Sequence, residues 1–446
     1  MKLWQKEDKA SLEEVDVFTV GNDRKMDLYL APFDVLGSMA HIRMLESIGL
    51  LTTDELLKLT VELRNIYRAI EDGLFTFDDD VEDVHSQIEL MLTRQLGDIG
   101  KKIHSGRSRN DQVLVDLRLF FRHEIRRVTE AMQQLFTLLL QLSEKHKDDL
   151  LPGYTHFQLA MPSSFGLWFG AYAESLADDL NLLSGAYRIV NRNPLGSGAG
   201  FGSSFPLNRT MTTELLGFES LNYNVVYAQM TRGKVEKTVA FALAGVGATL
   251  ARLAMDACLF MNQNFAFISF PDELTTGSSI MPHKKNPDVL ELIRARCNHI
   301  AAIPNNIALI TTNLPSGYHR DMQLLKEMLF PAFESLIDCL RMMTLMLSNI
   351  KIRQNILDDE QYRYLFSVEE VNKRVLAGVP FRDAYRQVGQ EIESGTYKPT
   401  LTIDHTHEGS IGNLCNDRIR GYFDETLRSF DFRRVDDCLN NLLGVS

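Results

Sequence analysis

Apolar residues recur at helical spacing over three long stretches of the chain, 113–142, 165–183 and 235–260. Within each stretch they follow i, i+3, i+4 and i+7 steps, which place side chains on one face of an α-helix. A helix of about 30 residues is about 45 Å long and needs parallel partners along its length. The pattern therefore predicts a bundle of long helices, and core packing is the simplest interpretation of each apolar stripe.

Proline positions support this division. The long intervals between Pro32 and Pro152, Pro206 and Pro271, and Pro331 and Pro380 contain no proline. A helix interior excludes proline because it lacks the N–H group and clashes with the preceding turn. We expect an all-α chain with an N-terminal helical domain (1–105), a central long-helix bundle (106–355) and a small C-terminal helical domain (356–446). Such a bundle can be shared between subunits, and apolar spacing near residues 435–442 predicts one more packed helix.

Composition changes this picture only by what it excludes. The chain has 446 residues, of which 45% are hydrophobic and 24% charged, as in a folded globular protein. A formal net charge of −12 disfavours a general nucleic-acid binder, which needs a basic face. Five cysteines without a C-x-x-C pair disfavour a disulfide framework or a zinc site. The N-terminal residues lack a signal-peptide pattern, and the apolar run 239–251 is too short to cross a bilayer, so we expect a cytoplasmic protein without membrane or nucleic-acid partners.

Standard cofactor motifs are absent. The alternating glycines of 196–202 place Phe201 where a dinucleotide-binding G-x-G-x-x-G motif needs its third glycine. His405 and His407, followed by Glu408, could form a metal pair, but a loop turn is the simpler interpretation because no third ligand lies nearby. We therefore expect neither a cofactor nor a metal.

Three polar segments, 105–112, 153–158 and 276–288, interrupt the apolar pattern. The first carries two arginines at the start of a predicted helix, which suits a carboxylate or phosphate, although a charged helix cap is an equally simple explanation. The second carries His156, and a lone histidine is more often structural than catalytic. The third combines glycine, paired serines, paired lysines and two prolines. A mobile loop between long helices suits a lid with a catalytic group, and a bare surface loop would not need this composition.

The third segment, TGSSIMPHKKNPD, closely resembles the G-S-S-x-M-P-x-K-x-N-P loop of the fumarase/aspartase superfamily. The other two, SGRSRNDQ and YTHFQ, have the order and spacing of its argininosuccinate lyase branch. Further matches are Asp83-Val84-His85, PLGSGA at 194–199, YHRDMQ at 318–323 and GVPFR at 378–382. The resemblance extends from about residue 15 to about residue 390, and the ordered set is far more specific than any single motif.

This resemblance implies a reaction and a role for each segment. The branch cleaves argininosuccinate to arginine and fumarate by cofactor-free anti β-elimination. The resemblance implies that Ser278 is the base, that His156 is a candidate acid oriented by Glu291, and that Lys284 and Asn286 hold the developing aci-carboxylate. The matched substrate-binding positions are His85, Arg109, Asn110, Thr155, Tyr318, Gln323 and Lys326. The resemblance also implies a homotetramer in which three subunits build each site around a small polycarboxylate.

Several residues depart from the family pattern. His283 replaces the usual loop glutamine, Thr231-Arg232-Gly233-Lys234 stands where Ser-Asp-Arg-Asp is usual, and Trp4-Gln5-Lys6 replaces Trp-Gly-Gly-Arg-Phe. The other departures are Gly21, His319 and Leu325. Because acidic residues are lost near the amino-acid end of the substrate, we expect the elimination to be retained and recognition of the arginine moiety to be altered, towards an N-acylated analogue.

Two other functions fit parts of this pattern. Adenylosuccinate lyase belongs to the same superfamily and its loop can also carry a histidine before lysine, but it should recognise a nucleotide phosphate. Segments 105–112 and 378–382 favour the argininosuccinate branch instead. A non-catalytic structural role, like that of the lens crystallins with this fold, is disfavoured because Ser278 and His156 are both present.

Overall fold

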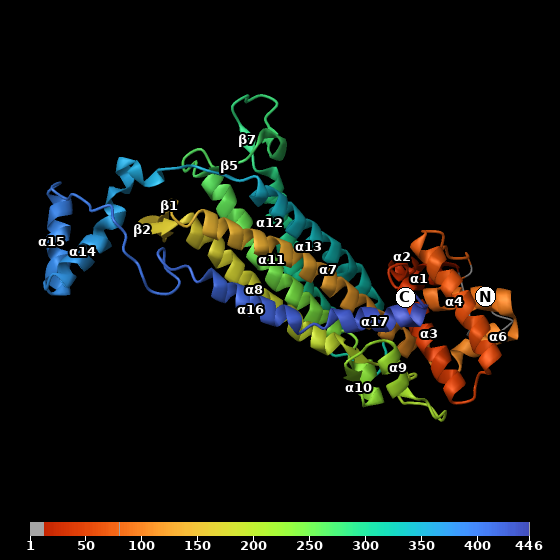
Figure 1. Ribbon diagram of the computed structural model, residues 1–446. Coiled ribbons are helices and arrows are strands. Elements are labelled where there is room, and N and C mark those ends of the chain that lie inside the picture. The colour runs from red at the N-terminus through yellow and green to blue at the C-terminus, as the bar shows by residue number, and fades with distance from the viewer. Residues whose placement is uncertain (1–12, 80, 446) are drawn as a thin grey trace.

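The computed structural model describes residues 13–79 and 81–445, and most of them are helical (Figure 1). The predicted all-α class is confirmed, because the strands of the described residues form only short two-stranded sheets. The substituted start of the chain, Trp4-Gln5-Lys6, lies outside the described residues.

Five long helices form the central bundle. They are α7 (Arg109–Lys145), α8 (Phe165–Val190), α11 (Lys234–Met261), α12 (Asp288–Thr311) and α13 (Leu324–Ser348). Three of them coincide with the predicted apolar stripes. Local signals fix their starts: the side chain of Ser108 caps α7, and that of Ser164 accepts a hydrogen bond from the N–H of Leu167 at 3.1 Å to cap α8.

The bundle core is mainly apolar, although α7 also buries charged residues such as Arg118 and Arg122. Aromatic residues of α7 and α13 interlock near the N-terminal end of α7, where the ring centroids of Phe120 and Phe330 are 4.3 Å apart. Small residues of α11 allow close approach elsewhere, since a Cβ added at Gly247 would lie 3.3 Å from the carbonyl oxygen of Cys297 on α12. These contacts give the long helices the parallel partners that their length requires.

Two prolines depart from the expectation that long helices avoid proline. Pro304 lies inside α12 and Pro331 lies inside α13. Each removes one backbone hydrogen bond, at a cost of about 3 kcal/mol in an isolated helix. Pro304 is buried among the core residues of α12, so packing along the bundle outweighs this local preference.

The N-terminal part of the chain forms a separate head at one end of the bundle (Figure 1). Its helices are α1 (Glu13–Val20), α2 (Asp23–Asp27), α3 (Ala31–Ser47), α4 (Thr53–Glu71), α5 (Val84–Leu96), α6 (Asp98–Lys101) and the short η1 (Lys102–His104). The head has its own hydrophobic core, which also contains Val115 and Leu119 from the first turns of α7. The start of α7 therefore belongs to both parts.

Short elements connect the long helices. They are β1 (Leu150–Thr155), β2 (Gln158–Ser164), β3 (Arg192–Asn193), α9 (Arg209–Leu215), β4 (Ser220–Leu221), α10 (Val225–Met230), β5 (Ile268–Ser269), η2 (Asp272–Leu274), β6 (Thr276–Gly277), β7 (Lys285–Asn286), η3 (Arg320–Gln323) and β8 (Lys351–Ile352). The pairs β1–β2, β5–β8 and β6–β7 are antiparallel, and β3–β4 is parallel. The β1–β2 hairpin lies at the end of the bundle far from the head, and the β6–β7 loop projects from its side (Figure 1).

The C-terminal part runs outward and then returns. After η4 (Ile356–Asp358) and η5 (Glu360–Phe366), helices α14 (Ser367–Leu376) and α15 (Phe381–Glu393) project beyond the hairpin end (Figure 1). Helices α16 (Asn416–Arg428) and α17 (Phe432–Leu443) then run back towards the head. Phe423 of α16 stacks on Phe136 with centroids 3.9 Å apart, and Leu442 enters the head core. The packed last helix is thus confirmed.

Helix α11 is the one helix of the described residues that is long and apolar enough to cross a membrane. Half of its most apolar window is buried, and it packs against α8 and α12. Both properties are those of a core helix.

Candidate active site

A cavity of about 240 Å³ opens where the head meets the bundle. Its wall consists of Asp23, Asp27, Glu82, Asp83, His85, Arg109, Asn110, Val113, Arg232, Tyr318, Arg320, Gln323 and Lys326. These residues come from α2, the start of α5, the start of α7, the turn before α11, and the segment that leads into α13. Six residues predicted from the sequence therefore meet here: His85, Arg109, Asn110, Tyr318, Gln323 and Lys326.

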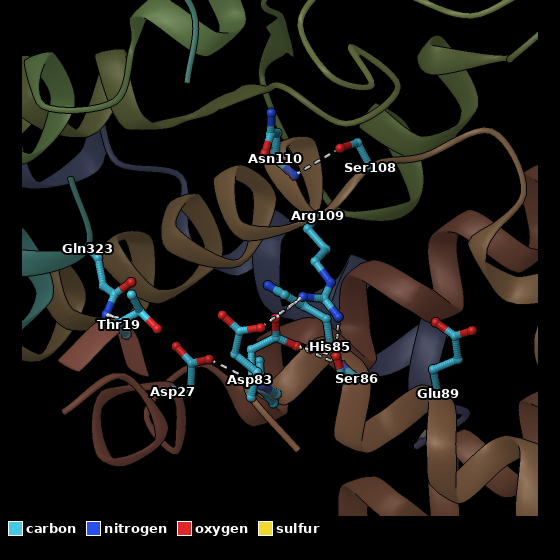
Figure 2. A network of polar contacts seen from close by, with 12 residues as sticks. Thr19, Asp27, Asp83, His85, Ser86, Glu89, Ser108, Arg109, Asn110 and Gln323 are labelled. Atoms are coloured by element: carbon cyan, nitrogen blue, oxygen red, sulfur yellow. Dashed lines mark hydrogen bonds and ion pairs between the residues drawn. The ribbon is translucent and has the colours of Figure 1, made fainter. Parts of the chain in front are cut away.

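Arg109 is fixed by the start of α5, as Figure 2 shows. Its guanidinium lies 2.9 Å from a carboxylate oxygen of Asp83 and donates to the hydroxyl of Ser86 at 2.5 Å. The other oxygen of Asp83 caps α5 by accepting from the N–H of Ser86 at 2.8 Å. Burial acts to raise the pKa of Asp83, but His85 and Arg109 together lower it below its usual value. The carboxylate therefore stays charged and holds Arg109 at the cavity wall.

Lys326 is buried and lies between two carboxylates of α2. Its ammonium is paired with Asp23 and is 2.6 Å from Asp27. Burial disfavours the charged ammonium, yet the two carboxylates raise the pKa of Lys326 above its usual value. The amide of Gln323 donates to the backbone oxygens of Thr19 and Val20, at 3.0 and 3.1 Å. The C-terminal end of α1 thus holds a residue of the cavity wall.

The segment 231–234, which differs from the usual family sequence, is held in place by an ion pair and by backbone hydrogen bonds. Arg232 is buried and lies 2.9 Å from Glu236 on the first turn of α11, and it also donates to the backbone oxygen of Met322 at 2.8 Å. Glu236 in turn accepts from the N–H of Gly233 at 2.7 Å. The arginine of this segment is therefore neutralised locally, without the acidic neighbours that the family usually has.

The glycine-rich segment 194–202 supports the start of α7. One oxygen of Asp111 accepts hydrogen bonds from the N–H groups of Gly196 and Gly198, each at 2.9 Å. Both glycines have positive φ, 83° and 60°, which residues with a Cβ rarely adopt. Burial raises the pKa of Asp111 to about 6. The alternating glycines therefore wrap a carboxylate next to Asn110, which explains why they do not form a dinucleotide motif.

His156 lies at the tip of the β1–β2 hairpin. Thr155 pairs with Gln158, so His156 and Phe157 form a two-residue turn, and both have positive φ, 54° and 58°. This is the backbone of a type I′ turn, which usually contains Asn or Gly. Strained backbone of this kind gathers at functional sites, and both side chains are exposed.

Ser278 lies on the loop between β6 and β7, and the segment 276–288 with its two prolines is non-helical up to Pro287, as predicted. Its hydroxyl oxygen accepts hydrogen bonds from the N–H groups of Ile280 and Met281, at 3.3 and 3.1 Å. Donors aimed at this oxygen favour its deprotonated form and so make serine a better base. Lys284 is exposed on the same loop, and Asn286 lies in β7.

Within one chain the cavity lies far from the hairpin and far from the Ser278 loop. Arg109 begins α7 and the hairpin with Thr155 and His156 follows its end, so a 37-residue helix of about 55 Å separates them. Helix α12, with 24 residues and a length of about 35 Å, likewise separates the Ser278 loop from Tyr318. Glu291, on the first turn of α12, lies 3.8 Å from Arg294 rather than beside His156. One chain therefore contains all twelve predicted residues in three separate places.

Comparisons with known proteins identify the family. A family model described as Lyase matches residues 11–302. Over 442 residues the chain is 64% identical to the argininosuccinate lyase of Parabacteroides distasonis, and the alignment covers 99% of each chain. The chain belongs to the argininosuccinate lyase family. A more distant member, from Thermotoga neapolitana, is 38% identical over 87% of this chain and 98% of its own.

Solved structures show that the fold is shared more widely than the sequence. EDDS lyase in complex with formate superimposes with a TM-score of 0.74 at 23% identity, covering 98% of this chain and 94% of that one. The class II fumarase of Schistosoma mansoni gives a TM-score of 0.71 at 16% identity, covering 93% of this chain and 94% of that one. The match to the lyase family model and to the curated relatives confirms the superfamily inferred from the loop motif. Family membership also favours the argininosuccinate branch over adenylosuccinate lyase.

Some residues of the cavity were missed by reasoning from the sequence. Asp23, Asp27 and Glu82 belong to no motif that the family resemblance singled out, and Arg320 lies in the matched segment 318–323 without having been predicted as a site residue, yet all four line the cavity. Arg320 donates to Glu82 at 2.7 Å across 238 residues of sequence. Such pairs leave no local signal, because each partner on its own looks like an ordinary surface charge.

Proposed function

We propose that the chain cleaves argininosuccinate to arginine and fumarate by β-elimination, as the family name implies. The observation that carries this proposal is the cavity lined by six predicted substrate-binding residues, in a chain 64% identical to an argininosuccinate lyase over nearly its whole length. The reaction needs a base, donors for a dianionic intermediate, and an acid for the leaving nitrogen. The loop would supply the base and the donors, the hairpin would supply the acid, and the cavity would bind the substrate.

The charges of the cavity fit a substrate with carboxylates at one end and cationic nitrogen at the other. Arg109 and Arg320 are cations suited to carboxylates. Asp23, Asp27 and Glu82 are carboxylates suited to an ammonium or guanidinium group. These acids compensate for those missing at 231–234, so they support a free amino end of the substrate over the N-acylated analogue expected from the sequence.

The loop and the hairpin would supply the chemistry. The Ser278 oxygen takes the proton from the carbon next to a carboxylate, and the electron pair of that C–H bond moves into the adjacent carboxylate to form the aci-carboxylate. Lys284 and Asn286 would stabilise this intermediate. When the pair returns to form the carbon–carbon double bond, the carbon–nitrogen bond breaks. His156 then protonates the departing nitrogen, and fumarate and arginine result.

The separation of the three groups supports a shared site. Because α7 holds Arg109 and His156 about 55 Å apart, one chain cannot bring them to the same substrate. We therefore include a homotetramer in the proposal, with each site built from the cavity, the loop and the hairpin of three different subunits. In this assembly Glu291 and His156 would meet across a subunit boundary.

A spectrophotometric assay tests the activity. Fumarate formation, followed by its ultraviolet absorbance, should be rapid with argininosuccinate and at least about 100-fold slower with its Nα-acetyl derivative, because an acyl group removes the charge that the carboxylates bind. Adenylosuccinate should give no fumarate. Preference for the acetylated compound would restore the N-acylated alternative, and absence of fumarate from every compound would refute the proposal.

Mixed oligomers test the shared site. Chains with Ser278→Ala and chains with His156→Gln should each lose most of their activity, yet co-expressed chains should regain more than either variant alone, because some sites then receive an intact loop and an intact hairpin. Light scattering should give four times the chain mass of 50.7 kDa. An active monomer, or mixed oligomers without any activity, would contradict the assembly.

The cellular setting belongs to the same proposal. An argininosuccinate lyase that releases arginine acts in arginine biosynthesis, and we propose that it does so in the cytoplasm. The five cysteines are all free, and Cys297 and Cys339 are buried, as in a protein of a reducing compartment. The proposed steps use only protein side chains and no cofactor.

A further inference from the structure

Two buried carboxylates contact His85, and neither belongs to a motif described above. The Nδ1 of His85 is 3.2 Å from a carboxylate oxygen of Asp34 on α3 and 3.5 Å from one of Asp116 on α7. Asp34 and Asp116 are fully buried, and His85 is 8% exposed. His85 also lines the cavity. Because Nδ1 is engaged by the carboxylates, Nε2 is the ring nitrogen that remains for a ligand.

The two carboxylates differ in how they are held. Asp34 accepts a hydrogen bond from the amide of Gln112 at 2.9 Å, in addition to its contact with His85. Neither oxygen of Asp116 has a hydrogen-bond partner within the described residues. Asp34 is thus the closer and better supported partner of His85, and Asp116 is the more weakly held one.

The three ligand atoms lie within 4.8 Å of one another, which is also the spacing of a metal site. The surroundings favour an ion pair over a metal. The guanidinium of Arg107 donates to Ser38 at 3.0 Å, beside Asp34, and its positive charge acts on both carboxylates. A divalent cation would be repelled by this arginine and would have to displace the donor from Gln112.

Charged residues from several surrounding elements act on the cluster formed by His85, Asp34 and Asp116. Besides the members of the cluster itself, they are Asp27 of α2, Asp83 before α5, Glu89 of α5, His104 of η1, Arg107 before α7 and Arg109 of α7. Burial acts to lower the pKa of His85, but the charge and hydrogen bond of Asp34, with smaller effects of Asp116 and Asp83, raise it to about 9. Burial and the neighbouring Asp34 raise the pKa of Asp116 well above its usual value, so Asp34 is the main negative partner of His85. The imidazole is therefore an imidazolium at neutral pH.

We propose that Asp34 is a positioning residue that holds His85 as a charged imidazolium at the cavity wall, where its Nε2–H binds a carboxylate of the substrate. Asp34 does not touch the substrate and acts only through His85. The inference deepens the proposed function, since it rests on a substrate with carboxylates. It adds a fixed positive charge to Arg109 and Arg320, from a residue type that is normally neutral at the pH of the cytoplasm.

Binding of succinate, a dicarboxylate that cannot undergo elimination, tests this role by calorimetry. In the wild-type enzyme at pH 8, binding should take up almost no protons, because His85 already carries its charge. In the Asp34→Asn variant the imidazole should be mostly neutral at pH 8, so binding should take up close to one proton and the Kd should rise about tenfold. Proton uptake is measured by repeating the titration in buffers with different ionisation enthalpies.

Matched variants separate this role from a structural one. Asp116→Asn should raise the Kd less than Asp34→Asn, because Asp116 is farther from Nδ1 and lacks a supporting donor. Asp98→Asn changes an exposed carboxylate that pairs with Lys101 and should change nothing. A rise in Kd for Asp34→Asn that is the same at every pH, without proton uptake, would overturn the proposal in favour of a packing role.

The pH profile of the wild-type enzyme provides a test that does not depend on the folding of an Asp34 variant. The Kd for succinate should be flat up to about pH 8 and should rise above about pH 9, and His85→Gln should abolish this rise. An unchanged alkaline rise in His85→Gln would refute the role of His85. Loss of activity after chelation, restored by Zn²⁺, would instead identify the group as a metal site. Because succinate binding needs no turnover, these results can fail or succeed independently of argininosuccinate cleavage.

Discussion

In the cavity the charged side chains are already paired and most of them are buried or half-buried, whereas on the hairpin tip and the loop they face solvent. Lys326 is 5% exposed and lies between two carboxylates. His156 and Lys284 are exposed, and neither forms an ion pair with any other residue that the structure describes. Burial and pairing fix the geometry of a binding site in advance. The exposed residues lack such support within the chain, and a neighbouring subunit would have to supply it.

The two regions also differ in the backbone that carries them. Helix ends hold the cavity residues, while a strained two-residue turn and a loop rich in glycine, serine and lysine hold the others. Loops of this kind can move on substrate binding and exclude water from the reaction. Substitutions in the first region should therefore affect stability and affinity, and those in the second should affect turnover.

The largest effect should come from Ser278→Ala. Removing the base should lower kcat by about 1,000-fold, because general-base catalysis contributes about 100- to 10,000-fold. The affinity for succinate, measured by calorimetry, should stay within about twofold of wild type, since the variant leaves every residue of the cavity wall unchanged. Full activity of the variant in the fumarate assay would remove Ser278 as the base.

Lys326→Met should have the largest effect on stability. It leaves Asp23 and Asp27 close together without their cation, and breaking such a buried pair costs about 3 kcal/mol or more in the free energy of unfolding. Denaturant titration measures the change. The control is Lys58→Met, which breaks an exposed pair with Asp54 at 2.6 Å and should cost less than about 1 kcal/mol. Equal losses in the free energy of unfolding for the two variants would show that the buried ion pair of Lys326 contributes no more to stability than an exposed one.

His156→Gln should lower kcat by about 100-fold, as expected for loss of a general acid. Thermal stability should be unchanged, because the side chain is exposed and makes no contact that holds the hairpin. His146→Gln is the matched control: this histidine lies 2.6 Å from Asp149 at the end of α7 and should affect stability rather than kcat. A loss of kcat in the control alone would point to the wrong histidine.

The smallest effect should come from Lys285→Ala. Lys285 forms an exposed ion pair with Asp272, which contributes less than about 1 kcal/mol. The adjacent Lys284→Ala, by contrast, should lower kcat by about 100-fold if its ammonium stabilises the aci-carboxylate. Steady-state kinetics compare the two. Similar kcat values for both variants would mean that the loop acts through its general charge rather than through one lysine.

The long helices of the bundle could be predicted from the sequence wherever apolar residues recur at helical spacing over many turns. The stripes at 113–142, 165–183 and 235–260 contain enough helical periods to define α7, α8 and α11. The proline argument was wrong for α12 and α13: the buried Pro304 packs well enough to offset its lost hydrogen bond, while Pro331 is exposed and the packing of the rest of α13 holds that helix. Local preference therefore identifies helices more safely than it excludes them.

Some residues of the candidate site could be predicted from the sequence and others could not. Residues within dense motifs, such as Arg109 and Ser278, could be singled out from the sequence. Asp27 and Asp34 could not, because their significance comes from partners 299 and 51 residues away. A carboxylate inside the apolar stripe of α7, as at Asp116, is the one sequence signal that would have pointed to the buried group.

The length of α7 has a consequence for how the chain can change over time. In a shared site, the length of α7 would determine the position of His156 of one subunit relative to the cavity of another. Inserting one residue in its middle would advance the hairpin by about 1.5 Å and turn it by about 100°. Insertions should therefore be tolerated in the projecting segment around α14 and α15, whereas α7 can lengthen only if α8, α11, α12 and α13 lengthen with it.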